Sequence, residues 1–316
     1  MLNSSNALSL VVISCQALQK LLGNMKLKPA IGINLLSLLF LLIISACGGS
    51  HTNKENSSAP LKEFTCYSNT VKDTFYITVQ LPLNYDKEPK KRYPVVVLTD
   101  ANFYFPMLAP VVHQYEKGGL LPPLILVGVG YKSFELMNSL RVRDYLYPQA
   151  IPSDDMKAPG GGLRYYQFIT HDLLSKIDRN YRTETNTRTL LGHSFGGYFS
   201  LFALQQQISE KRNDFKGFVS ASPSLWYNNN YLFRLPDQLK NTLLKDTISV
   251  FLSVGSLETP KEWTIQLVEN MSKQLDNSHA SKLKLTTTVY NDLDHMDAGL
   301  ISFIRGMEKM YVKPGQ

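Results

Sequence analysis

One serine of the chain stands in a context that suits a nucleophile. Residues 190–197 read Leu-Leu-Gly-His-Ser-Phe-Gly-Gly, so Ser194 lies between an apolar, strand-like run and an apolar, helix-like run. A serine nucleophile must stand on a sharp, strained strand-to-helix turn, and Gly192 and Gly196 would let the strand and the helix cross closely. A helix starting at Phe195 points its N–H groups towards a developing oxyanion. The pattern indicates a nucleophilic serine rather than an ordinary glycine-rich turn.

Such a serine needs a base within hydrogen-bond reach and an acid that orients the base. In the chain order serine, acid, histidine, both partners lie on loops after later strands. His295 alone among the six histidines has this order and position, five residues past a predicted strand at 283–290. We predict His295 as the base and Glu258, four residues past a predicted strand at 248–254, as the acid. The sequence leaves three other acids open: Glu262, Asp292 and Asp294.

The acidic residues around His295 could also indicate a metal site. Asp292, Asp294 and Asp297 surround the histidine, but no second histidine or cysteine stands at ligand spacing. We therefore expect neither a metal nor a cofactor.

The elements that must position these residues follow an α/β pattern. Continuous apolar strands alternate with helical patterns, which is typical of a mostly parallel sheet covered by helices on both faces. Residues 64–67 and 74–81 instead alternate between apolar and polar side chains and read as antiparallel opening strands. The continuous strands are predicted at 93–100, 124–130, 187–191, 217–221, 248–254 and 283–290.

The loop after the first buried strand is the predicted second half of an oxyanion hole. In this layout an early strand–helix loop supplies one backbone donor and the residue after the nucleophile supplies the other. We predict the N–H of Ala101 or Asn102 for the first donor and that of Phe195 for the second. The alternative is that residues 100–102 form only a turn and a helix cap.

Residues 131–162 show no clean periodicity and read as a lid-like insertion. Arg141 and Arg143 are candidates for binding an anionic group of a substrate, and an ion pair with Asp144 is the alternative role.

Two aromatic residues follow the predicted strand at 217–221. Trp226 and Tyr227 leave the carboxyl end of that strand, which is the active edge of open α/β sheets. They are candidates for lining a substrate pocket, with core packing as the alternative.

The N-terminal residues read as an export and anchoring segment. An apolar run at 31–46 follows Lys26 and Lys28 and ends in Ile-Ser-Ala-Cys, which resembles a bacterial lipoprotein signal with Cys47 as the lipidated residue. We expect residues 1–46 to be removed, 47–62 to form a flexible tether and 63–316 to form one domain, lipid-anchored in the bacterial cell envelope, facing the periplasm or the cell surface. A plain transmembrane anchor is the alternative.

Composition excludes some functions. The net charge of +7 falls to +4 without residues 1–46, which hold three lysines and no acid, and this mild balance does not indicate nucleic-acid binding. Beyond Cys47 only Cys66 remains, so we expect no disulfide within the domain.

The chain resembles the esterase D-like family of α/β-hydrolases, and most of all its branch of periplasmic enterochelin (siderophore) esterases. The resemblance implies serine and histidine at Ser194 and His295, with a less uniform acid. This chain has Asp100-Ala101 where the family usually has Asp-Gly. The stretches that carry the resemblance are 93–100, 141–145, 161–181, 189–197, 221–226 and 254–258.

These patterns and the resemblance together predict an α/β-hydrolase fold and a serine carboxylic-ester hydrolase that acts through an acyl-enzyme on a small-molecule ester. A siderophore ester is one candidate substrate, because the family also includes feruloyl esterases and S-formylglutathione hydrolases. Two alternatives are an acyltransferase on the same fold and a non-catalytic surface binding protein on a degenerate hydrolase fold.

Overall fold

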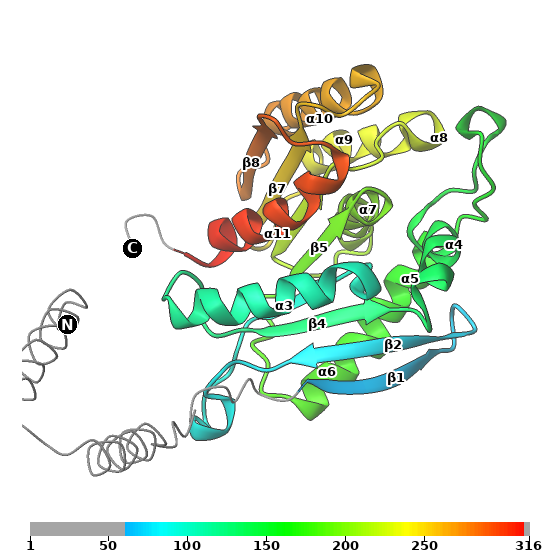
Figure 1. Cartoon of the computed structure of the whole chain (residues 1–316). Helices are drawn as coiled ribbons and strands as arrows, with labels where there is room; N and C mark the ends of the chain where they lie inside the picture. Colours follow the sequence, from blue (N-terminus) through cyan, green and yellow to red (C-terminus); the bar gives the residue numbers. More distant parts are fainter. Residues whose placement is uncertain (1–60, 313–316) are drawn as a thin grey trace, which may run out of the picture. The chain divides into compact units, whose positions relative to one another are not determined.

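A twisted eight-stranded sheet forms the centre of the chain (Figure 1). The computed structural model describes residues 61–312, so the predicted signal segment, Cys47 and nearly all of the tether lie outside the described residues. The strand order is β1-β2-β4-β3-β5-β6-β7-β8. The strands are β1 (Lys62–Ser68), β2 (Asp73–Gln80), β3 (Val95–Leu98), β4 (Ile125–Gly130), β5 (Thr189–His193), β6 (Gly217–Ala221), β7 (Ile248–Gly255) and β8 (Leu283–Tyr290).

The pairing of the strands follows the hydrophobic patterns. β1 pairs with β2 and β2 with β4 in antiparallel fashion, whereas all pairs from β4 to β8 are parallel. The half-buried strands β1 and β2 carry the alternating patterns, and the strands buried on both faces carry the continuous apolar ones. The predicted fold class, a mostly parallel sheet with antiparallel opening strands, is confirmed.

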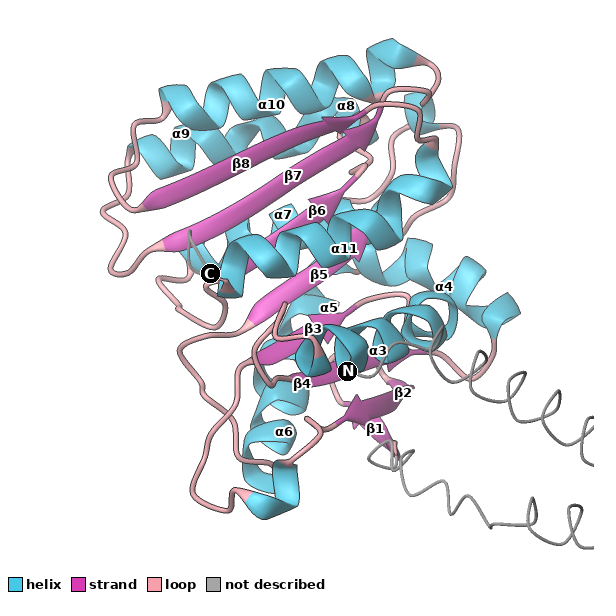
Figure 2. Cartoon of the chain, turned by 60° about the vertical axis from the view of Figure 1, so that its left-hand side comes forward, coloured by secondary structure: helices cyan, strands magenta, loops and turns pink. Residues whose placement is uncertain are grey.

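Helices cover both faces of the sheet (Figures 1 and 2). On one face, α3 (Ala101–Lys117) and α11 (His295–Tyr311) pack on side chains such as Val96 and Leu191. The other face, with Val97 and Leu190, is covered by most of the other helices. These include α5 (Gly162–Gln167), a π-helical turn (Phe168–Leu173), α6 (Leu174–Asn180), α7 (Phe195–Ser209), α9 (Leu235–Lys240) and α10 (Ile265–Asn277).

The predicted irregular insertion contains a regular helix. Within residues 131–162, α4 (Phe134–Tyr145) begins after Ser133, whose side chain accepts a hydrogen bond from the N–H of Leu136. It contacts α7, α5 and α3 at the carboxyl end of the parallel strands. Sequence periodicity missed α4 because arginines and an aspartate that form ion pairs replace a simple apolar stripe along it.

The remaining helical elements are short, and none is a membrane span. They are α8 (Tyr227–Asn230) and 3₁₀ turns at Tyr85–Lys87, Pro152–Asp154, Tyr231–Arg234 and Lys261–Trp263. Within residues 61–312, no helix combines the length and the apolarity needed to cross a bilayer.

Candidate active site

Ser194 occupies a strained turn between β5 and α7. Its φ of 59° and ψ of −117° lie in a region that side chains avoid, and its N–H donates to the carbonyl oxygen of Ala221 at 2.9 Å. A Cβ on Gly192 would lie 1.9 Å from the carbonyl oxygen of Gly196, and one on Gly196 would lie 2.6 Å from Oγ1 of Thr99. Only glycine at these two positions permits the sharp turn that presents the serine side chain at the end of the sheet.

The turn after β3 lies beside the serine turn because β3 and β5 are hydrogen-bonded neighbours, with Leu98 opposite Leu191. Within the described residues, the backbone N–H groups of Ala101, Asn102 and Phe195 have no hydrogen-bond acceptor. These groups begin α3 and α7, where N–H groups have no partner within the helix. Both predicted oxyanion donors are therefore available on adjacent helix ends.

Alanine at position 101 is compatible with this turn. The positive φ of 52° falls on Asp100, whereas Ala101 already belongs to α3. A Cβ on Gly128 of β4 would lie 2.8 Å from the Cβ of Ala101, so the alanine methyl group fills the space above that glycine. Ala101 stands where the family usually has glycine, and Gly128 on the neighbouring strand leaves room for its methyl group.

His295 and Glu258 are hydrogen-bonded to each other. Nδ1 of His295 lies 2.8 Å from Oε2 of Glu258, and the carboxylate is buried while 41% of the imidazole side chain is exposed. His295 is the first residue of α11, so the expectation that it lies in a loop is wrong. The helix starts there because the side chain of Asp294 accepts hydrogen bonds from the N–H groups of Met296 and Asp297.

The surroundings of Glu258 keep its carboxylate ionised. Burial by itself raises the pKa, but hydrogen bonds from His295, from the Ser222 hydroxyl at 2.5 Å and from the Gly255 N–H at 2.9 Å outweigh it and lower the pKa of Glu258. An ionised carboxylate only accepts hydrogen bonds, so Nδ1 of His295 carries the proton and Nε2 has the lone pair. Nε2 is therefore the atom that can receive a proton.

The alternative acids take other roles or positions. The Asp294 carboxylate caps α11, and Asp292 lies on the exposed turn after β8. The side chain of Glu262 lies outside what the structure describes. Among the described acids, Glu258 is the one that contacts the His295 ring.

Ser194 and His295 line one cavity of about 150 Å³. No hydrogen bond joins the two side chains within residues 61–312, and such contacts often tighten only when a substrate binds. The wall combines aromatic and apolar side chains with polar and charged ones. Its other members are Asp100, Phe103, Tyr104, Phe134, Met137, Asn138, Arg141, His193 and Met296.

Arg141 reaches this cavity from α4. Its Nε and Nη2 donate to the two carboxylate oxygens of Asp100 at 2.8 Å each, and Nη2 also donates to the carbonyl oxygen of His193 at 3.1 Å. Nη1 has no acceptor in the described part of the chain. Arg141 thus joins three elements at the site and retains one donor nitrogen for a bound molecule.

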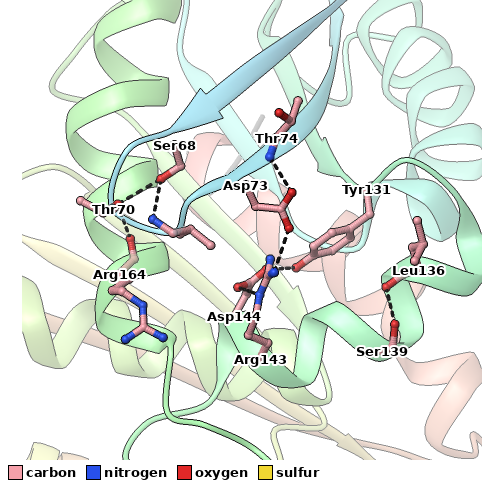
Figure 3. Close-up of polar contacts among 11 residues, drawn as sticks. Ser68, Thr70, Asp73, Thr74, Tyr131, Leu136, Ser139, Arg143, Asp144 and Arg164 are labelled. Atoms are coloured by element: carbon pink, nitrogen blue, oxygen red, sulfur yellow. Dashed lines mark hydrogen bonds and ion pairs between the residues drawn. The ribbon is translucent and has the colours of Figure 1, made fainter.

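The other candidate substrate contacts lie away from the cavity. Arg143 donates to Asp73 at 2.8 Å and to Asp144 at 2.7 Å, and the Tyr131 hydroxyl donates to the same aspartate (Figure 3). The structure therefore gives Arg143 the alternative ion-pair role and ties α4 to the first residue of β2.

Neither predicted aromatic residue reaches the cavity wall. Tyr227 is fully buried and donates from its hydroxyl to the carbonyl oxygen of Pro148, as in the core-packing alternative. Trp226 is half-buried and packs edge-on against Phe195, with ring centroids 6.3 Å apart. The cavity wall includes neither residue.

Sequence reasoning missed several residues of the site. Ser222 directly follows β6 at the active edge, a position that could have identified it. Of the wall residues on α4 only Arg141 was predicted, and Phe134, Met137 and Asn138 were missed because the helix was unrecognised. His193 was not proposed as a site residue, yet its ring contacts the backbone of His295.

No metal-binding arrangement is found in residues 61–312, where no group of three or more histidine, cysteine, aspartate or glutamate side chains could hold an ion.

Comparison with known proteins identifies named esterases as relatives. The ferri-bacillibactin esterase BesA of Bacillus subtilis (strain 168) is 32% identical over 198 residues, which is 58% of this chain and 66% of BesA. The apo-salmochelin esterase of Escherichia coli O6:H1 is 30% identical over 145 residues, 43% of each chain. The matched segments thus span just under two thirds of BesA and less than half of the second relative.

Solved structures share the fold. The BES protein from Bacillus cereus has a TM-score of 0.69 and 25% identity, covering 82% of this chain and 96% of that one. The siderophore hydrolase EstA from Aspergillus nidulans has a TM-score of 0.67 and 22% identity, covering 78% and 92%. The pattern of the Putative esterase family matches residues 68–298, which include the Ser194 turn, Glu258 and His295. The chain belongs to this family.

Proposed function

We propose that the protein is a serine carboxylic-ester hydrolase in which Ser194, His295 and Glu258 form a catalytic triad. The observation that carries the proposal is the bond between His295 and the buried, ionised Glu258, on the cavity that also holds the strained Ser194. A buried carboxylate that fixes the tautomer of an imidazole is the arrangement that activates a serine hydroxyl.

The proposed reaction proceeds through an acyl-enzyme. Oγ of Ser194 attacks the ester carbonyl carbon while Nε2 of His295 takes the hydroxyl proton. The N–H groups of Phe195 and of Ala101 or Asn102 stabilise the oxyanion. Collapse of the tetrahedral intermediate breaks the ester C–O bond, and His295 protonates the departing alkoxide oxygen. Water repeats the sequence on the acyl-enzyme and releases the carboxylic acid.

The cavity supports an ester with an aromatic acyl arm as substrate. Phe103, Tyr104 and Phe134 offer ring surfaces, and the spare Nη1 of Arg141 offers a donor for a phenolate or carbonyl oxygen. The cavity of about 150 Å³ is smaller than the roughly 300–1,000 Å³ of whole-ligand pockets. It fits one arm of a larger molecule such as a siderophore ester, the class in the name of the siderophore hydrolase EstA.

Steady-state assays of the full chain test the proposal. Wild type should hydrolyse p-nitrophenyl acetate and butyrate, and Ser194→Ala and His295→Ala should each lower kcat by at least about 10³-fold. A panel of siderophore, feruloyl and sugar esters then identifies the acyl group, and chromatography with added alcohols separates hydrolysis from acyl transfer. Wild-type protein that is folded but inactive on every ester would refute the proposal.

We also propose a lipid anchor on Cys47, which would tether the domain to a membrane of the bacterial cell envelope. The apolar run before this cysteine and the polar segment after it support the anchor. Metabolic labelling with an alkynyl fatty acid should mark the wild type but not Cys47→Ala. Equal labelling of both proteins would contradict it.

A further inference from the structure

The residue before the nucleophile makes two buried hydrogen bonds. His193 ends β5, and strand alternation directs its ring to the face that α3 and α11 cover. Only 3% of the residue is exposed. Its Nε2 lies 2.7 Å from the carbonyl oxygen of His295, and its Nδ1 lies 2.9 Å from the hydroxyl oxygen of Tyr104 on α3.

These partners fix one tautomer of the ring. A carbonyl oxygen only accepts hydrogen bonds, so Nε2 of His193 carries the hydrogen and donates it to His295. Nδ1 therefore has the lone pair, and the Tyr104 hydroxyl donates to it. Burial and, next, the neighbouring His295 lower the pKa of His193 to about 3, which keeps the ring neutral.

The start of α11 packs closely against His193 and Tyr104. A Cβ on Gly299 would lie 2.3 Å from the Tyr104 hydroxyl oxygen and 3.2 Å from Cδ2 of His193, so this turn of α11 tolerates no side chain there. The rings of His193 and His295 have centroids 4.5 Å apart. The hydrogen bond from His193 to the carbonyl oxygen of His295 and the Asp294 cap of α11 together hold the backbone of His295.

A neutral neighbour also suits the reaction. His295 becomes positively charged when it takes the serine proton, and a charged ring 4.5 Å away would oppose that step. The titratable groups that face His193 are Tyr104 from α3, His295 from α11 and Arg141 from α4, whose guanidinium donates to the His193 carbonyl oxygen. Arg141 is neutralised by Asp100, so the charge next to the reacting imidazole stays low.

We propose that His193 and Tyr104 are positioning residues for the base: they hold the backbone of His295 so that its Nε2 faces Ser194. The inference rests on the proposed ester hydrolysis. It assigns a specific task to the histidine of the Gly-His-Ser-Phe-Gly turn, and to a tyrosine 89 residues earlier in the chain.

The test compares three variants in the full chain. His193→Leu removes the donor to His295, His193→Gln restores an N–H donor at similar reach, and Tyr104→Phe removes only the hydroxyl that fixes the tautomer. A misplaced base lowers the chemical step, and displacements near 1 Å reduce rates by about 100-fold. We expect kcat on p-nitrophenyl butyrate to fall at least tenfold in His193→Leu and Tyr104→Phe, with KM within about twofold, and His193→Gln to recover most of it.

The outcomes separate the inference from the proposed function. An inactive wild type overturns the proposed function itself, before any variant is compared. An active wild type with unchanged kcat in folded His193→Leu and Tyr104→Phe overturns the inference alone. Equal losses in His193→Gln and His193→Leu, with circular dichroism showing both folded, would also overturn it. Should His193→Leu fail to fold, Tyr104→Phe and His193→Gln still decide the matter.

Discussion

At the scale of single residues, the charge of Glu258 is what makes His295 a base. Three hydrogen bonds keep this buried carboxylate ionised, and its contact with Nδ1 leaves the lone pair on Nε2. A neutral group in its place could not stabilise the imidazolium that forms during attack.

Glu258→Gln should therefore reduce kcat strongly. The amide keeps the shape but loses the charge and can turn its NH₂ group towards Nδ1, which favours the wrong tautomer. We expect a decrease of about 10²- to 10⁴-fold in kcat on p-nitrophenyl butyrate. Glu88→Gln, at an exposed ion pair with Lys91, is the matched control and should leave kcat unchanged. A Glu258→Gln enzyme within threefold of wild type would mean that Ser194 and His295 act without an acid.

At the scale of elements, α4 connects several elements at the carboxyl end of the parallel strands. Arg141 on this helix pairs with Asp100 at the start of α3 and with the carbonyl oxygen at the end of β5, while Arg143 pairs with the first residue of β2. The insertion is therefore an anchored wall of the site, and its position depends on a buried ion pair.

Removing Arg141 alone should destabilise the fold more than removing the charges of both Arg141 and Asp100. Asp100 is 2% exposed, so Arg141→Leu leaves a buried carboxylate without a partner, which typically lowers the free energy of unfolding by about 3–5 kcal/mol. Asp100→Asn combined with Arg141→Leu should recover a clear part of that loss in urea unfolding. Equal stability of the single and the double variant would show that the ion pair does not hold α4 in place.

The same elements show what the sequence could and could not predict. The ranges predicted for β6 and β8 agree with the structure because continuous or alternating apolar runs report directly on burial. The irregular reading of 131–162 missed α4 because tertiary ion pairs, rather than an apolar stripe, stabilise this helix. His295 was expected on a loop but begins α11, because the sequence pattern did not reveal that Asp294 caps this helix.

The same difference between patterns along the chain and contacts between distant residues applies to the candidate site. The serine turn, the histidine and the acid could be proposed because their order along the chain relative to the strands limits where each lies. The pairing of Arg141 with Asp100 and of His193 with Tyr104 joins residues 41 and 89 positions apart. Contacts between such distant residues leave no local pattern, so only the folded chain shows them.

At the scale of the whole molecule, the buried His193 links stability to pH. Its pKa is lowered from 6.5 to about 3 in the folded chain. Between these values the unfolded chain binds a proton that the folded chain does not, so folding stability falls as the pH drops through this window. Above pH 6.5 neither state binds the proton, and the contribution does not vary.

His193→Gln should flatten this dependence. Because of His193 alone, each pH unit below 6.5 lowers the free energy of unfolding of the wild type by up to about 1.4 kcal/mol. His193→Gln lacks this contribution. Urea unfolding of both proteins at pH 7.5, 6.0 and 5.0 measures the difference. His171→Gln, at an exposed histidine, is the control and should follow the wild type. Parallel pH curves for His193→Gln and wild type would rule out a buried neutral histidine.

The most direct test of the account is covalent labelling of the nucleophile. The full chain is treated with a fluorophosphonate, and intact-mass and peptide mass spectrometry locate the adduct. The account predicts one phosphonyl group on Ser194, none in Ser194→Ala, and slower labelling in His295→Ala because the base is missing. A folded wild type that remains unlabelled, or that is labelled equally in Ser194→Ala, would contradict the assignment of Ser194 as the nucleophile.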